Sequence, residues 1–196
     1  MVRCVCEMKD ALAGFLAALL LTGILFPGAV IAEAPFRIVV LPFYTEGGVD
    51  SRDGGAVTLD YRRALRFINN QLVRHNFEVI NPFAYETAEQ EYSRALQQVR
   101  ENSPLAAGQM CKKYNTDAVY IIWLNLKLNR TYDGYCKAAA RLDGEGYDAA
   151  SRDLGAGLSK TFMITRRHCD DAIAEVEKEA GDLVGRTLTA WTQKGQ

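Results

Sequence analysis

The chain has 196 residues, of which 48% are hydrophobic, and its 23 basic and 24 acidic side chains leave a formal net charge of −1. This length supports one domain with at most a tail, and the composition excludes a disordered chain, a collagen-like repeat and a membrane protein with several spans. The balanced charge argues against general nucleic-acid binding, which needs a basic excess. With two histidines and no recognisable catalytic motif, we expect no metal and no cofactor.

The first 32 residues are typical of a secretory signal peptide. An uncharged apolar run over residues 11–26 is followed by Pro27-Gly28 and by Val30-Ile31-Ala32, and a small-residue ending of this kind predicts cleavage after Ala32. The run has about 16 residues, fewer than the ~20 that cross a bilayer. We therefore expect a periplasmic domain over residues 33–196 without a stable membrane anchor after cleavage. An uncleaved signal anchor in the inner membrane is the alternative.

The start of the chain has a second interpretation. Met8 leads through Lys9-Asp10 directly into the apolar run, so it is a candidate for the true start. Cys4 and Cys6 precede the run, whereas a lipoprotein signal carries its acylated cysteine after it. Lipid anchoring is therefore not expected.

Three cysteines, Cys111, Cys136 and Cys169, remain in the part that we expect to be exported. In an oxidising compartment, one disulfide and one free thiol are the simplest arrangement of an odd number. Cys136 lies on an expected strand and Cys169 at the start of the last expected helix, so this pair is the candidate disulfide. It would close a loop of about 33 residues and contribute roughly 3–4 kcal/mol. Three buried thiols without a bridge are the alternative.

The first elements of the exported part alternate between strand and helix patterns. Residues 36–43 (FRIVVLPF) form a nearly continuous apolar run, as in a strand buried on both faces. A glycine-rich loop follows over residues 45–58. Residues 60–74 predict a helix, because apolar side chains recur at i, i+4, i+7 and i+11. Residues 76–80 predict a short strand.

The central segment contains two helices and the strongest strand pattern. A polar helix is expected over residues 85–100, and a second over 104–114, with Ser103 as its cap and Pro104 at its first position. Residues 117–128 (DAVYIIWLNLKL) are apolar on both faces at first and then alternate. They predict a strand that is covered on both faces only along its first half.

The last third predicts antiparallel strands and a closing helix. Asp133-Gly134 and Asp143-Gly144 are turn signals, which would bound a strand over residues 135–142 and place one or two strands over 147–164. A helix follows over residues 170–191. Its expected buried positions are Ile173, Val176, Ala180, Leu183, Thr187 and Trp191. The order β-α-β-α-α-β-β-β-α predicts an α/β (α+β) domain with a single mixed sheet and helices mainly on one face.

Two parts of this pattern resemble a known family. One is a first strand ending in residues 41–43 (LPF), a glycine-rich loop and a helix that leads to residues 77–80 (FEVI) before Asn81-Pro82. The other is a helix ending in residues 111–116 (CKKYNT) and followed at once by residues 117–120 (DAVY). Together they resemble the periplasmic domain at the amino terminus of the Tol-system propeller protein. Similar domains occur in the curli secretion channel, in lipoprotein activators of peptidoglycan synthases and in an exopolysaccharide-export lipoprotein.

The resemblance implies a small adaptor or assembly domain of the bacterial periplasm. This sequence departs from it by showing neither the lipidated cysteine nor the propeller of those relatives. We expect a non-catalytic protein that binds an envelope protein complex, alone or as a homo-oligomer. A peptidoglycan- or polysaccharide-associated protein that stacks Tyr132, Tyr135 and Tyr147 on sugars is the alternative. A small hydrolase or thiol enzyme, using Cys111 or Cys136 with His75 or His168, is less favoured.

Two groups of side chains are candidates for partner contacts. Three arginines follow one stripe of the first helix, and three side chains surround the second expected turn. They are Arg63, Arg66 and Arg74, and Arg141, Tyr147 and Arg152. A solvated helix face and a solvated turn are the alternatives. In the last helix, Gly181 and Gly185 are expected to permit close approach to the sheet.

Overall fold

The computed structural model describes residues 34–45, 49–50, 61–83 and 88–194 of the chain. The predicted signal peptide over residues 1–32, the alternative start at Met8 and most of the glycine-rich loop lie outside the described residues. The chain divides at Ala34, and every element below belongs to the unit Pro35–Gln196. No helix in the described ranges is long and apolar enough to span a bilayer.

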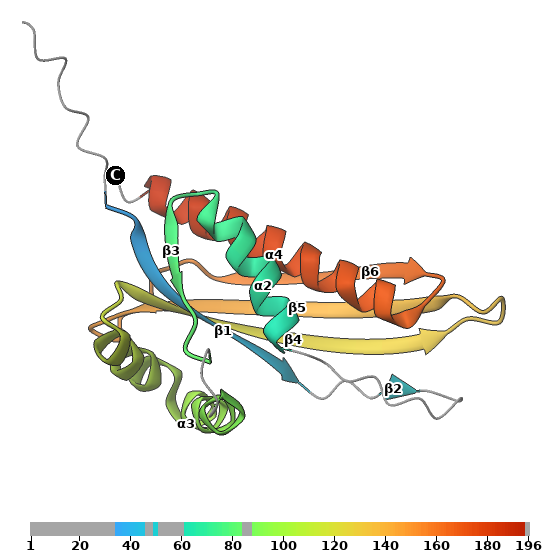
Figure 1. Cartoon of the computed structure of the whole chain (residues 1–196), viewed down its shortest axis with the longest axis horizontal. Coiled ribbons are helices and arrows are strands. Elements are labelled where there is room, and N and C mark those ends of the chain that lie inside the picture. Colours follow the sequence, from blue (N-terminus) through green and yellow to red (C-terminus); the bar gives the residue numbers. More distant parts are fainter. Residues whose placement is uncertain (1–33, 46–48, 51–60, 84–87, 195–196) are drawn as a thin grey trace, which may run out of the picture. The chain divides into compact units, whose positions relative to one another are not determined.

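A single mixed sheet forms the centre of this unit (Figure 1). Its strands lie in the order β3-β1-β4-β5-β6, and a short β2 pairs with the far part of β4. The strands are β1 (Phe36–Thr45), β2 (Val49–Asp50), β3 (Phe77–Ile80), β4 (Ala118–Arg130), β5 (Cys136–Asp148) and β6 (Leu158–Arg166). β1 is parallel to β3 and β4, whereas β4, β5 and β6 are antiparallel neighbours. The predicted mixed sheet is confirmed.

Within the described ranges, three helices cover the sheet, two on one face and one on the other. They are α2 (Tyr61–Val73), α3 (Ala88–Tyr114) and α4 (Cys169–Lys194). α2 and α4 pack over one core, which includes Ile38 and Leu142, and α3 packs over a second core, which includes Val39 and Val119. Neighbouring residues of a strand point to opposite faces. β1 and the first half of β4 are therefore apolar on both faces because both faces are covered there.

α3 contains the two helical segments that the sequence predicts, joined at a kink. Asn102 has non-helical angles, with φ −161° and ψ 92°. Its side-chain oxygen accepts a hydrogen bond of 3.1 Å from the Leu105 amide, so Asn102 caps the second segment. The expected cap, Ser103, instead donates its hydroxyl to the Val99 carbonyl. The cap is thus one residue earlier than predicted.

The turn predicted at Asp143-Gly144 is wrong, because β5 continues through both residues to Asp148. A Cβ atom on Gly144 would lie 2.7 Å from the Tyr120 hydroxyl oxygen, and one on Gly146 would lie 3.0 Å from the same ring. Glycine is needed here so that the buried Tyr120 ring can lie across β5. The Tyr120 hydroxyl then donates a hydrogen bond of 2.9 Å to the Ala156 carbonyl oxygen. The glycines serve packing, not chain reversal.

The pair Gly181 and Gly185 permits close approach to α2 rather than to the sheet. A Cβ atom on Gly181 would lie 3.1 Å from the backbone of Phe67, and one on Gly185 would lie 3.3 Å from Gln71. Without side chains at these two positions, α4 can approach α2 closely. The predicted role was correct in kind and wrong in partner.

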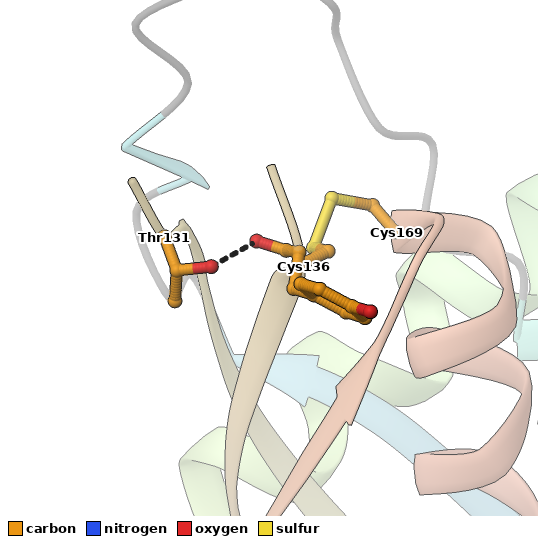
Figure 2. The surroundings of a disulfide bond; sticks show 4 residues. Thr131, Cys136 and Cys169 are labelled. Carbon is orange, nitrogen blue, oxygen red and sulfur yellow. Dashed lines mark hydrogen bonds between the residues drawn. A yellow bond between two sulfur atoms is a disulfide. The ribbon is translucent and has the colours of Figure 1, made fainter. Parts of the chain in front are cut away.

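A disulfide joins Cys136 and Cys169, which are 33 positions apart in the sequence. Figure 2 shows it at the start of β5, where it holds the first residue of α4 against the sheet. Beside it, the Thr131 hydroxyl donates to the Tyr135 carbonyl at 3.0 Å in the β4–β5 turn. Cys111 is buried and not bridged. This is the candidate pairing that the sequence suggested.

Candidate interaction surface

α3 covers only part of its side of the sheet. Trp123 marks the boundary, with its ring 5.2 Å from that of Phe43 between centroids. Beyond it, the side chains on this face change from apolar to mainly polar, and no helix of the described chain packs over them. In Figure 1, β4, β5 and β6 extend well past α3. We name this area the open sheet face: Asn125, Lys127, Lys137, Ala139, Arg141, Asp143, Ser159, Thr161, Met163 and Thr165.

The strand register arranges the open sheet face in rows. Asn125, Arg141 and Thr161 lie side by side across the three strands. In the next row, Met163 lies beside Ala139, and its exposed fraction is 58%. Cross-strand neighbours are close enough to contact one partner together. The register thus places the apolar side chains of Met163 and Ala139 beside side chains that can form hydrogen bonds.

One hydrogen-bonded network orders part of this face. Arg141 donates to both carboxylate oxygens of Asp143, at 2.8 and 3.3 Å, and the Ser159 hydroxyl donates to Asp143 at 2.6 Å. Partial burial by itself would raise the pKa of Asp143. The hydrogen bonds from Ser159 and Arg141 outweigh that effect, and the pKa is lowered. Asp143 is therefore a carboxylate at neutral pH and holds Arg141 in place.

Two lysines give the open sheet face a positive charge. Lys127 lies opposite Ala139, and Lys137 lies opposite Asn129, so the two lysines are diagonal neighbours on β4 and β5. Among the described residues, neither has an acidic partner within salt-bridge distance. Unpaired lysines on a surface attract acidic groups at long range. The surface is therefore suited to a partner that carries negative charge.

β6 is one edge of the sheet. It pairs with β5 on one side, and within the described ranges no strand pairs with its other side. Phe162 and Ile164 pack toward α4, whereas Thr161 and Met163 belong to the open sheet face. An edge strand has backbone N–H and C=O groups available to an added strand. The open sheet face and this edge are continuous.

The candidates near the second expected turn do not form one group. Arg141 lies on the open sheet face. Tyr147 lies near the other end of β5, where its hydroxyl donates to Glu145 at 3.0 Å; burial and this hydrogen bond raise the pKa of Tyr147 to about 12. Arg152 binds Asp148, at 2.7 Å. The structure therefore separates Arg141 from the other two.

Arg63 and Arg66 of α2 lie on the opposite side of the sheet from the open sheet face, and Arg74 follows the last residue of this helix. Arg66 and Arg74 are exposed. Arg63 turns inward and forms an ion pair with Glu177 of α4, whose side chain is completely buried. The six candidates therefore occupy three places, and Arg63 is used within the fold.

Glu177 is a residue that the sequence interpretation missed. Its carboxylate accepts a hydrogen bond of 2.6 Å from the Tyr44 hydroxyl of β1 as well as those from Arg63. Burial and the adjacent carboxylate raise the pKa of Tyr44 far above its usual value. Glu177 follows Ile173 by four positions on the apolar stripe of α4, and this was the signal for its burial. Three positions expected on the buried side, Leu183, Thr187 and Trp191, are only half-buried.

The alternative chemistries receive little geometric support. Tyr147 is 12 positions along β5 from the β4–β5 turn that holds Tyr132 and Tyr135, a span of about 40 Å at the rise of a strand. Cys136 is in the disulfide, and Cys111 is 1% exposed. Within the described residues, no group of three or more His, Cys, Asp or Glu side chains is placed to hold a metal.

A cavity of about 230 Å³ lies on the α3 side, away from the open sheet face. Leu41, Phe83 and Met110 are among its apolar lining residues, and Arg94 and Lys113 are among the polar ones. Lys113 is 3.6 Å from Glu91. The volume is below the range of about 300–1,000 Å³ that is usual for ligand pockets. This cavity is therefore small for a ligand site.

Comparison with known proteins identifies weak structural likenesses only. No protein-family model matches the chain, and no curated protein is detectably similar to it in sequence. Lipoprotein GNA1162 from Neisseria meningitidis is similar with a TM-score of 0.47 and 12% identity, over 74% of this chain and 94% of that one. Protein CT253 from Chlamydia trachomatis gives 0.44 and 9%, over 82% and 95%. A dodecamer of a PelC variant from Paraburkholderia phytofirmans gives 0.39 and 15%, over 81% and 89%. These values are too low to assign a family, and the resemblance to the Tol-system domain stays a prediction.

Proposed function

We propose that this chain is an exported, non-catalytic adaptor of the bacterial cell envelope. It binds another protein through the open sheet face and the adjoining edge of β6. Its partner belongs to an envelope assembly, and the contact is reversible rather than part of a permanent oligomer.

The observation that carries this proposal is that β4 and β5 continue beyond β1 and beyond the part of the sheet that α3 covers. Each strand has 13 residues, whereas β1 pairs with β4 only from Ala118 to Asn125. The extension has an apolar core on the α4 side and exposes Arg141, Met163 and polar groups on the other. Arginine and methionine are enriched in protein interfaces, and interfaces of this reversible kind are partly polar.

Two further observations support export. Residues 1–32 are typical of a signal peptide, and Cys136 and Cys169 form a disulfide. Disulfides persist in oxidising compartments and are rare in the cytosol. Both features favour a location outside the cytoplasm.

Site-specific photo-cross-linking in the bacterial host tests the proposal. One variant carries a photoreactive amino acid at Met163 on the open sheet face, and its control carries the same group at Val73 on α2. These positions are matched, with exposed fractions of 58% and 59%. We expect a discrete cross-linked species in the envelope fraction from position 163 and none from position 73. Absence of a species from position 163, or equal labelling from both positions, would contradict the proposal.

A further inference from the structure

We infer that the free edge of β6 binds an extended, acidic segment of another protein, which adds to the sheet as a further strand. This inference rests on the proposed function and names the chemistry of the partner. The inference is based on a long free strand edge that lies beside three basic side chains.

The geometry of β6 suits strand addition. The strand has nine residues, contains no proline and pairs in unbroken register with β5 from Leu158 to Arg166. Edges that are protected from pairing are usually short, bulged, interrupted by proline or lined with charged side chains. β6 has only the last of these features, in Lys160 and Arg166, and this charge repels like-charged strands but attracts acidic ones. In β6, the exposed Met163 side chain lies next to the free edge and would pack against a side chain of the added strand. The edge is therefore open to an additional strand.

The charge of this segment selects the partner. Residues 158–168 contain three cationic side chains, Lys160, Arg166 and Arg167, and no acidic residue. Arg166 lies 3.5 Å from Glu175 of α4. Within the described residues, Lys160 and Arg167 have no acidic partner at salt-bridge distance, and both are exposed. The neighbouring Asp143 is already bound to Arg141 and Ser159, so it does not neutralise them.

The same charges disfavour a second copy of the chain at this edge. Pairing two copies through β6 would bring together strands that each carry Lys160 and no carboxylate, with the exposed Arg167 directly after each strand. Like charges across paired strands are destabilising. An acidic strand would instead place carboxylates beside these two side chains. The edge thus disfavours self-association and favours an acidic partner.

The test uses the exported chain with its disulfide intact and two labelled nonapeptides. One alternates valine and glutamate, and its control alternates valine and lysine. Fluorescence anisotropy measures binding, and amide hydrogen exchange reports on β6. We expect the acidic peptide to bind and the basic peptide not to bind. In the complex, the β6 amides that face away from β5 should exchange more slowly, because an added strand accepts their hydrogen bonds.

Charge reversal locates the contact. The double variant K160E/R167E should lower the affinity for the acidic peptide roughly tenfold or more. The control R66E/R74E makes the same change of charge on α2 and at the residue that follows it, and should leave the affinity unchanged. Equal loss in both variants would indicate attraction by total charge and would overturn the inference.

Three further results would also overturn it: equal binding of both peptides, binding of the acidic peptide without slower exchange in β6, or a dimer in sedimentation that protects β6 without peptide. The last result would assign the edge to a second copy. If these tests fail while Met163 still cross-links to an envelope protein, the proposed adaptor function stands and only the acidic-strand inference falls. If the cross-link is also missing, both fall.

Discussion

The side chain of Glu177 connects three elements at one point, because it bonds to Tyr44 of β1 and Arg63 of α2 from its place on α4. Buried carboxylates are rare and are costly when they lose a partner. The Arg63→Ala substitution would leave Glu177 buried with only Tyr44 of these two partners. We expect it to lower the free energy of unfolding by about 3 kcal/mol, and Tyr44→Phe by about 1–2 kcal/mol, in urea titrations at pH 7.

Arg66→Ala is the matched control for this prediction. Arg66 lies on the same helix and is exposed, so its loss should change the free energy of unfolding by no more than about 0.5 kcal/mol. If Arg63→Ala costs no more than this control, the buried ion pair does not stabilise the fold.

Asp148 predicts a dependence of stability on pH. Its carboxylate accepts hydrogen bonds from the Arg152 amide, the Arg152 side chain and the Ala150 amide. These bonds, the first above all, lower the pKa of Asp148 in the folded state. Its contribution is therefore present above the unfolded pKa of about 3.9 and is lost as the pH falls through the lower folded value.

The Asp148→Asn variant isolates this charge. At pH 7 we expect it to be less stable than the natural chain by about 1 kcal/mol, a modest value because solvent screens the site. The difference should begin to shrink as the pH falls below about 4 and should disappear below the folded pKa of Asp148, in thermal unfolding measured from pH 2 to pH 8. A difference that stays constant over that range would contradict the assignment to the Asp148 carboxylate.

At the scale of elements, the crossing of α2 and α4 depends on Gly181. A methyl group there would lie 3.1 Å from the backbone of Phe67, which cannot move as a flexible side chain can. We expect Gly181→Ala to lower the free energy of unfolding by about 1–3 kcal/mol. Gly157→Ala is the control, because nothing lies within 4 Å of its added carbon. If urea titrations give the same change in the free energy of unfolding for both variants, the close approach of α4 to α2 does not require glycine at position 181.

Most elements follow from local patterns in the sequence. β1 and the first half of β4 were predictable because strands covered on both faces are nearly continuous apolar runs. The error at Asp143-Gly144 has a non-local cause: the glycine accommodates Tyr120, a ring from the neighbouring strand. No pattern within ten residues of Gly144 distinguishes this use from a turn.

The candidate site was less predictable than the fold. Arg141 could be selected as a charged residue, but the open sheet face depends on where α3 ends over the sheet. The pairing of Arg63 with Glu177 joins residues 114 positions apart and depends on how α2 meets α4. From the sequence alone, only the position of Glu177 on an apolar stripe of the last helix could be recognised.

At the scale of the whole molecule, the disulfide is a contribution to stability that a reductant can remove. Reduction of Cys136–Cys169 should lower the free energy of unfolding by roughly 3–4 kcal/mol, because it releases a loop of about 33 residues. Urea titrations with and without a reductant measure this, and the Cys136→Ala/Cys169→Ala double variant should match the reduced chain. Unchanged stability on reduction would contradict it.

Alkylation of the chain that begins at residue 33 checks the pairing itself. Unfolded without reductant, it should take up one label, on Cys111, and three after reduction. Three labels without reductant would show that the bridge is absent.

The position of β1 in the sheet has a consequence for the order in which the fold can form. β1 is the first strand of the described unit, yet it pairs with β3 and β4, and its Arg37 amide bonds to Asp117, 80 positions later. Contacts so distant in sequence form late. A chain that passes through a secretion channel amino terminus first cannot complete its central strand until β4 has emerged. If the chain is exported as proposed, β1 therefore remains without its β4 partner until that later strand is available.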